Sequence, residues 1–224
     1  MSQVVTEKLD KLTKPQLIDL VEKVIKENTD LIKERDELLA IKKYMEESNK
    51  RLIRLERNQN EHLQYTRRDT IEITGIPKNI KQDDLEDEVI KIFEAANVSV
   101  GGERLSKIQI QAVHRIGKAQ EKTVAKFVNR RFASEALYAS KNLKDNSPYN
   151  SPIYLNPSLC REFAYLNFLV RKAAKGKRVA RWKVKNGITL VKISENDPKF
   201  HEVTHRIDLI DLGIYDVIPE ETPL

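Results

Sequence analysis

Residues 64–77 have the sequence QYTRRDTIEITGIP, and the pattern of the chain changes within this stretch. From Thr70 to Pro77 apolar and polar residues alternate until a proline interrupts them, which is typical of a β-strand. The residues before Gln64 instead follow a seven-residue period and include no glycine. We therefore predict that a long helix ends near Gln64 and that a domain containing β-strands begins directly after it.

The N-terminal segment, residues 1–65, is predicted to form a coiled-coil oligomerisation helix. Apolar side chains occupy the a position of six successive heptads: Leu17, Val24, Leu31, Leu38, Met45 and Leu52. The d row is half polar, so the seam is imperfect. Because a helix of this length with so many polar residues is not stable alone, we expect parallel self-association. The alternative is a long helix that folds back on the rest of the chain.

The end of this helix favours a trimer over a dimer. Arg51 takes a g position, Leu52 and Leu55 take a and d, and Glu56 takes e. An arginine at g reaches a glutamate at e on the neighbouring helix while its aliphatic stem covers the seam. This arrangement is similar to the short pattern associated with trimeric coiled coils.

The middle segment, residues 66–150, alternates predicted strands and helices. Strands are expected at 70–77, 108–113 and 123–128, and helices around the apolar sets Leu85, Val89, Ile92, Phe93 and Phe132, Ala136, Leu137. Ile153 to Leu155 supplies a last strand. The resulting order, βαββαβ, predicts a ferredoxin-like sandwich of the kind found in RNA-recognition-motif (RRM) domains. The whole chain is thus expected to be α+β, with a long parallel coiled coil, an RRM-like domain and a small basic α+β C-terminal domain.

The C-terminal segment, residues 151–224, contains a predicted helix from about Ser158 to Gly176 and a hairpin. Asn186 and Gly187 lie between two alternating runs, and both central residues of a tight hairpin turn need positive φ angles. On the first strand of this hairpin, lysine and arginine alternate with apolar residues. We expect Trp182 to pack in the core, the alternative being that it stacks on bases.

The basic charge of the protein is concentrated in one stretch of this segment. The net charge of the 224-residue chain is +6, but residues 161–192 alone contain ten Lys or Arg and one acid, and residues 193–224 form an acidic tail of net charge −6. Phosphates attract a basic surface regardless of base sequence. We therefore predict a nucleic-acid-binding domain whose contacts are Arg171, Lys172, Lys175, Lys177, Arg178, Arg181, Lys183 and Lys185.

The middle domain is expected to bind the nucleic-acid backbone rather than bases. RRM domains stack bases on aromatic side chains of their central strands. Here Glu72 stands where an aromatic would be expected, and the third strand has Phe127 but lacks the glycine and first aromatic of the RRM motif. Tyr154 and Tyr165 are further candidates for stacking. The basic candidates for backbone contacts are Arg67, Arg68, Arg115, Lys126, Arg130 and Arg131.

No pattern in the chain predicts an enzyme. His201 to His205 matches the zinc-peptidase pattern H-E-x-x-H, but no third ligand is placed to complete the site, so we interpret it as a polar loop before a short helix. The single cysteine, Cys160, excludes an internal disulfide and is expected to be a small core hydrophobe. We expect no metal, cofactor, small-molecule substrate or membrane insertion, and a soluble cytoplasmic or nuclear location rather than secretion.

Several of these stretches, in this order, resemble the first-open-reading-frame proteins of LINE-type retrotransposons. The resembling segments are residues 64–77, 114–118, 124–127, 153–156 and 182–187. The C-terminal part is also similar to the few-polyhedra (FP) protein of baculoviruses. The resemblance implies a trimer formed through residues 14–64, with Arg67, Arg68 and Arg115 as backbone-contacting residues.

The resemblance further implies a self-associating protein that coats single-stranded RNA or DNA in a ribonucleoprotein particle and acts as a nucleic acid chaperone. Linked copies of a weak basic module then bind by avidity. The alternative is a structural or regulatory interaction protein of the FP kind that uses the coiled coil as a scaffold. A steep salt dependence of binding and competition by single-stranded RNA distinguish the first hypothesis from the second.

Overall fold

The computed structural model describes residues 13–117 and 119–217 of the chain. Lys118 of the predicted motif at 114–118, and Glu220 and Glu221 of the acidic tail, lie outside these residues. The chain divides into two compact units between Arg54 and Leu55. Long helices are combined with antiparallel sheets, so the α+β class is confirmed. No helix in the described ranges is both long and apolar enough to cross a membrane.

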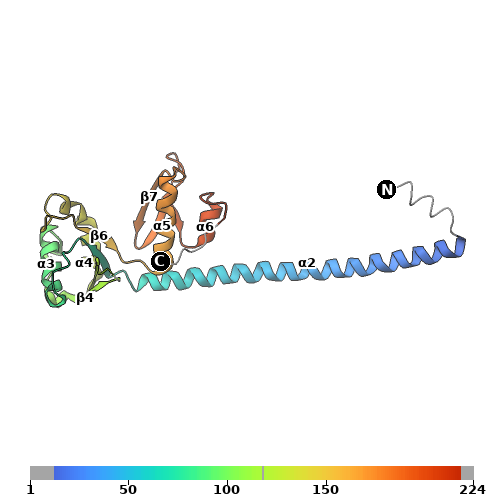
Figure 1. Cartoon of the computed structure of the whole chain (residues 1–224), viewed down its shortest axis with the longest axis horizontal. Helices are drawn as coiled ribbons and strands as arrows, with labels where there is room; N and C mark the ends of the chain where they lie inside the picture. Colours follow the sequence, from blue (N-terminus) through green and yellow to red (C-terminus); the bar gives the residue numbers. More distant parts are fainter. Residues whose placement is uncertain (1–12, 118, 218–224) are drawn as a thin grey trace. The chain divides into compact units, whose positions relative to one another are not determined.

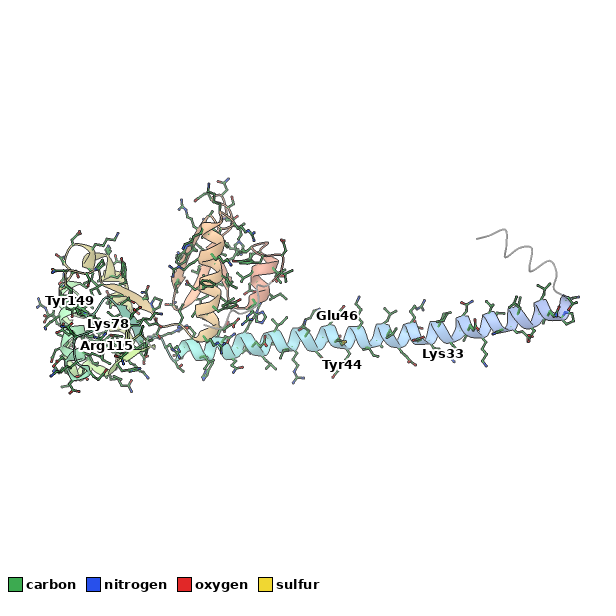
Figure 2. The ribbon with its side chains drawn as sticks, viewed as in Figure 1. Lys33, Tyr44, Glu46, Lys78, Arg115 and Tyr149 are labelled. Atoms are coloured by element: carbon green, nitrogen blue, oxygen red, sulfur yellow. The ribbon has the colours of Figure 1, made fainter. Side chains whose placement is uncertain are left out.

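Helix α2 (Lys14–Tyr65) is continuous for 52 residues (Figure 1). It begins where Thr13 donates its backbone N–H to Gln16 Oε1 at 2.9 Å, half of a capping box. The heptad side chains from Val24 to Leu55 are exposed, Leu31 by 61% and Met45 by 65%. Side chains extend away from this helix into solvent along its length, as Figure 2 shows for Lys33, Tyr44 and Glu46.

The first sheet contains four antiparallel strands, β1 (Thr70–Thr74), β4 (Ile110–Ile116), β5 (Lys122–Phe127) and β6 (Tyr154–Pro157). Their order in the sheet is β4-β5-β1-β6. Strand β1, the first of the four in the sequence, therefore lies between β5, the third, and β6, the last. Strand β6 pairs with β1 in the register Ile73↔Leu155. The last strand predicted at 153–155 therefore completes this sheet, although the domain division at residue 150 placed it in the C-terminal segment.

Helices α3 (Leu85–Ala95) and α4 (Arg130–Ala139) cover one face of this sheet (Figure 1). Alternation turns Ile71, Ile73 and Phe127 toward the helices, and all three are fully buried. Shorter elements fill the connections: η1 (Gln82–Asp84), β2 (Ser99–Val100), β3 (Glu103–Arg104), η2 (Lys107–Gln109) and η3 (Ser140–Lys144). Because η2 takes up residues 107–109, strand β4 begins at Ile110 rather than at the predicted residue 108.

Tyr149, in the loop before β6, ties this loop to helix α3 by donating a hydrogen bond to Glu88. Burial, helped by that hydrogen bond, raises the pKa of Tyr149 well above its ordinary value. On the opposite, solvent-facing side of the sheet, Lys122 lies 3.4 Å from Glu72. The central strands thus carry an ion pair on this side, formed by the same Glu72 that the sequence analysis found in place of an aromatic.

The C-terminal part has its own core between helix α5 (Arg161–Lys175) and a three-stranded sheet of order β7-β8-β9. The strands are β7 (Arg181–Lys185), β8 (Ile188–Lys192) and β9 (His201–Val203), and helix α6 (Arg206–Asp211) follows. Phe163, Leu166, Val191 and Leu209 are buried in this core. Cys160 joins them at 3% exposure, so its predicted role as a core hydrophobe is confirmed.

The predicted hairpin is confirmed, with Asn186 at φ 54° and Gly187 at φ 80° between β7 and β8. The prediction for Trp182 is wrong, because its side chain remains 39% exposed. It faces the same side as its cross-strand partner Val191, but β7 is an edge strand, so only part of the indole is covered. The guanidinium of Arg171 lies 5.9 Å from the centre of its ring.

The segment that matches H-E-x-x-H does not form a helix. His201 to Val203 is strand β9, paired with β8, and not the loop that we predicted. His205 instead caps helix α6, where its Nδ1 accepts the backbone N–H of Ile207. Within the described part of the chain, no group of three or more His, Cys, Asp or Glu side chains is placed to hold a metal ion.

Candidate nucleic-acid interface

A cleft of about 720 Å³ lies where the end of α2, helix α4 and the β7–β8 turn come together within the unit that follows Arg54. Four segments far apart in the sequence contribute to it. Its lining residues are Gln64, Arg67, Arg68, Thr70, Arg130, Ser134, Leu137, Tyr138, Leu155, Pro157, Ser158, Val184, Lys185, Asn186 and Gly187.

The cleft is positively charged. Arg67, Arg68, Arg130 and Lys185 all line it and are exposed, whereas no Asp or Glu occurs among the described residues that form its walls. Arg67 donates to Ser158 Oγ at 3.3 Å, and the guanidinium of Arg68 lies 4.7 Å from the ring centre of Tyr65. Four cations that converge from three segments, with no acid among the lining residues, form a site suited to a polyanion.

Helix α4 presents one face to the cleft. Arg130, Ser134 and Tyr138 are spaced four residues apart, so they lie one above another on the helix. The helix begins at Asn129, whose side chain accepts the backbone N–H of Arg131 at 3.0 Å. A cation, a hydroxyl and an aromatic ring therefore follow one another along this wall of the cleft.

Gln64 connects the segments that meet at the cleft, and its side chain is only 3% exposed. Its Nε2 donates to the carbonyl of Ser158 and its Oε1 accepts the backbone N–H of Cys160, each at 2.9 Å. A Cβ atom added to Gly187 would lie 2.2 Å from the same Nε2. The end of α2, the connection into α5 and the hairpin turn are thus held together by one polar side chain.

Two further contacts join the last turns of α2 to the C-terminal part. Arg57 forms an ion pair with Asp208 on α6. Glu56 Oε2 lies 2.8 Å from Nε2 of His205. Together with Gln64, these contacts hold the second core against the end of the helix, which places the β7–β8 turn beside Arg67 and Arg68.

The structure brings only some of the predicted basic residues of the middle domain together. Arg67, Arg68 and Arg130 line the cleft, whereas Arg131 is exposed outside its lining and Lys126 lies 3.9 Å from Asp69. Arg115 donates to the carbonyls of Pro77 and Gln120, at 2.6 and 3.2 Å. Its guanidinium therefore holds two loops of the first domain.

The eight predicted basic residues of the C-terminal part are all exposed, but of these only Lys185 lines the cleft. Lys183 stacks over Phe200 at 4.2 Å, Arg181 pairs with Glu195 at 2.7 Å, and Arg178 donates to the carbonyl of Ile214 at 3.3 Å. The remaining members of the predicted set are on the surface of α5 and the loop after it: Arg171, Lys172, Lys175 and Lys177.

The aromatic residue of the cleft is one that the sequence analysis missed. Among its described lining residues the only aromatic is Tyr138, which is 73% exposed. Of the predicted candidates, Tyr165 is buried in the second core, and Tyr154 is exposed on the first sheet outside the cleft lining. The four-residue spacing of Tyr138 from Ser134 and Arg130 was the signal that could have identified it.

We compared the chain with known proteins. It matches no protein-family model and no curated protein. The chemical interpretation of the cleft therefore rests on its own residues.

Proposed function

We propose that this protein binds single-stranded nucleic acid without catalysing a reaction, and that it does so as an oligomer that coats the strand and acts as a nucleic acid chaperone. The observation that carries the proposal is the cleft, in which four exposed cations meet with no acid among the described lining residues. Phosphates of a flexible strand can enter such a cleft and release counterions there. The exposed basic residues of α5 and β7 extend the positive surface beyond it.

We further propose that residues 70–157 form the RRM-like domain. In support, two helices cover one face of an antiparallel sheet in which β1 lies between the third and last strands. That sheet order is the one that a βαββαβ sandwich requires when both helical connections lie on the same face. The solvent-facing pair Glu72–Lys122 argues that this domain contributes cations at its edge rather than stacking on its sheet.

The proposed oligomer is a parallel coiled coil formed by α2, with three helices favoured over two. Its support is the row of exposed apolar a positions, which a single chain leaves in water. The side chains that dock the C-terminal part, Arg57 and Gln64, occupy f positions in the same register, on the outer side of a coiled coil. Arg57 and Gln64 therefore dock from a face other than the proposed seam, whereas Glu56, at the e position of the trimer pattern, is paired with His205 of its own chain.

This arrangement gives the protein its proposed mechanism. Each copy contributes a cleft of modest affinity, and the coiled coil raises the local concentration of the other clefts for the same strand. Because the contacts are mainly with phosphates, they hold the strand without fixing its sequence and let it exchange pairing partners. A coat of this kind binds long strands stably although each contact is weak.

The test is fluorescence anisotropy with a labelled single-stranded RNA of about 20 nucleotides, which is longer than the site of one module, titrated at several salt concentrations. In the test variant Arg67, Arg68, Arg130 and Lys185 are replaced by Ala. Loss of four phosphate contacts should lower the slope of log affinity against log salt by about 3, since each contact contributes about 0.7 for a single strand. The matched control removes four exposed cations outside the cleft lining: Lys81, Arg104, Lys144 and Lys199.

The control decides whether the cleft is the site. Equal losses in both variants would mean that the strand responds to net charge alone, and would contradict the proposal. If the unmodified protein does not bind RNA even at low salt, the coiled-coil scaffold protein of the FP kind becomes the better hypothesis.

A further inference from the structure

The cleft contains one feature that phosphate binding does not use, the ring of Tyr138. A single exposed tyrosine is ordinary on a protein surface. This one lies in the wall of a cationic cleft, in line with Arg130 and Ser134 on the same face of α4. It is 73% exposed although Leu137, its neighbour in the same wall, is half-buried.

The ring is partly oriented by a neighbouring cation. Lys141 Nζ lies 5.0 Å from the ring centre, so one face of the ring has a cation–π contact. A planar ligand needs only the other face. The ammonium group of Lys141 is also close enough to the ring to attract a phosphate that follows a stacked base.

Three of the four cations of the cleft lie on the other walls, whereas Arg130 shares α4 with Tyr138, two turns away from it. Arg67 and Arg68 come from the turn that follows α2, and Lys185 is the last residue of strand β7. A strand whose phosphates contact these residues has its bases free to turn toward α4. There the cleft offers an aromatic face, whereas the solvent-facing side of the central strands offers Glu72 and Val124.

We propose that Tyr138 stacks on an unpaired base of the bound strand and so makes the cleft selective for single-stranded nucleic acid. The inference rests on the proposed function and adds to it the residue that distinguishes an unpaired base from a base pair. In a duplex each base is stacked between its neighbours and has no face to offer, so Tyr138 contributes nothing to duplex binding. Phosphate contacts alone do not make this distinction.

The experiment uses the full chain with two labelled single-stranded probes of equal length, an oligouridine and the same backbone with abasic sites. Stacking on one base contributes about 1–3 kcal/mol by alanine substitution, so Tyr138→Ala should weaken oligouridine binding between about 5-fold and about 150-fold. The salt slope should stay unchanged, because no phosphate contact is removed. The abasic probe should bind the variant and the unmodified protein equally.

Two further variants make the result specific. Tyr138→Trp should restore oligouridine affinity, since it keeps an aromatic face at the same position. Tyr154→Ala is the matched control, because Tyr154 is 59% exposed on strand β6 and lies outside the described cleft lining. Its removal should leave both probes unaffected.

The outcomes separate this inference from the proposed function. Salt-dependent binding that Tyr138→Ala leaves unchanged would overturn the stacking role and leave the cleft as a phosphate site. An equal loss on the abasic probe would also overturn it, by showing that the substitution damages the cleft. Absence of any salt-dependent binding by the unmodified protein would overturn both.

Discussion

Gln64 is a buried amide placed where three segments of the chain meet, and both ends of its side chain are hydrogen bonded. A buried donor or acceptor that loses its partner costs about 1–3 kcal/mol. Its contact with the hairpin requires glycine at 187, because the turn has φ 80° and any Cβ would collide with the amide. The position of Lys185, two residues before this glycine, therefore depends on Gln64.

We predict that Gln64→Ala lowers the free energy of unfolding by about 1–3 kcal/mol, because Ser158 and Cys160 lose their partners. We also expect a smaller salt slope of RNA binding, since Lys185 is no longer held in the cleft. Urea unfolding and anisotropy measure the two effects. In a double-mutant cycle, adding Lys185→Ala should lower the slope little further.

The control for this prediction is Gln111→Ala, which truncates an exposed glutamine of β4 outside the cleft. It should change neither stability nor binding. Additive effects of the Gln64 and Lys185 substitutions would argue against a positioning role, because they would show that the two residues act independently.

At the scale of single elements, the last turns of α2 contribute both to the proposed helix pairing and to the docking of the C-terminal part. The a and d row continues to Leu55, while Arg57 and Gln64 on another face hold the C-terminal part. Asp208 does more than pair with Arg57, since its carboxylate also accepts the backbone N–H groups of Thr204 and His205. Helix α6 therefore keeps its cap when Arg57 is removed.

We predict that Arg57→Ala loosens the docking of α6 on α2 without unfolding α6 itself. The side chain of Arg57 is 37% exposed, so the loss is only about 1 kcal/mol. Hydrogen exchange should rise in residues 201–211 and stay unchanged in the first sheet. Arg54→Ala, which removes an exposed arginine one turn earlier, is the matched control. Faster exchange in both variants would assign the effect to the charge of the helix rather than to docking.

Most elements of the chain were predictable from local pattern. Helix α3 follows from apolar spacing, and Asn186-Gly187 from the φ angles of a tight turn. The local pattern gave a wrong prediction where burial depends on tertiary context. Trp182 alternates in sequence like a core residue, but it lies on an edge strand and stays partly exposed. The cleft was only partly predictable, because its basic residues were visible in the sequence whereas Tyr138 and Gln64 matter through contacts between distant segments.

At the scale of the whole molecule, α2 carries two apolar rows that the single chain leaves exposed. One is the a row, with Leu31 and Leu38, and the other is the b row, with Ile32 and Leu39. The exposed fractions of the two rows are similar: 61% and 59% for the two a residues, and 50% and 56% for the two b residues. Exposure alone therefore does not say which row is buried in an oligomer. The heptad pattern favours burial of the a row, because a positions of a coiled coil face the partner helices and b positions lie about 100° away.

We predict that Leu31→Asp with Leu38→Asp dissociates the proposed oligomer, because each a layer would then bury several carboxylates together. Ile32→Asp with Leu39→Asp adds the same charge to the b row and should leave the oligomer intact, as measured by sedimentation. If coating depends on avidity, the a-row variant should also lose affinity for long RNA by a factor on the order of 100 while binding a short strand unchanged. Dissociation by the b-row variant instead would place the seam on the other face of α2. Equal affinity of both variants for long RNA would show that each cleft binds alone and that the coiled coil serves another purpose.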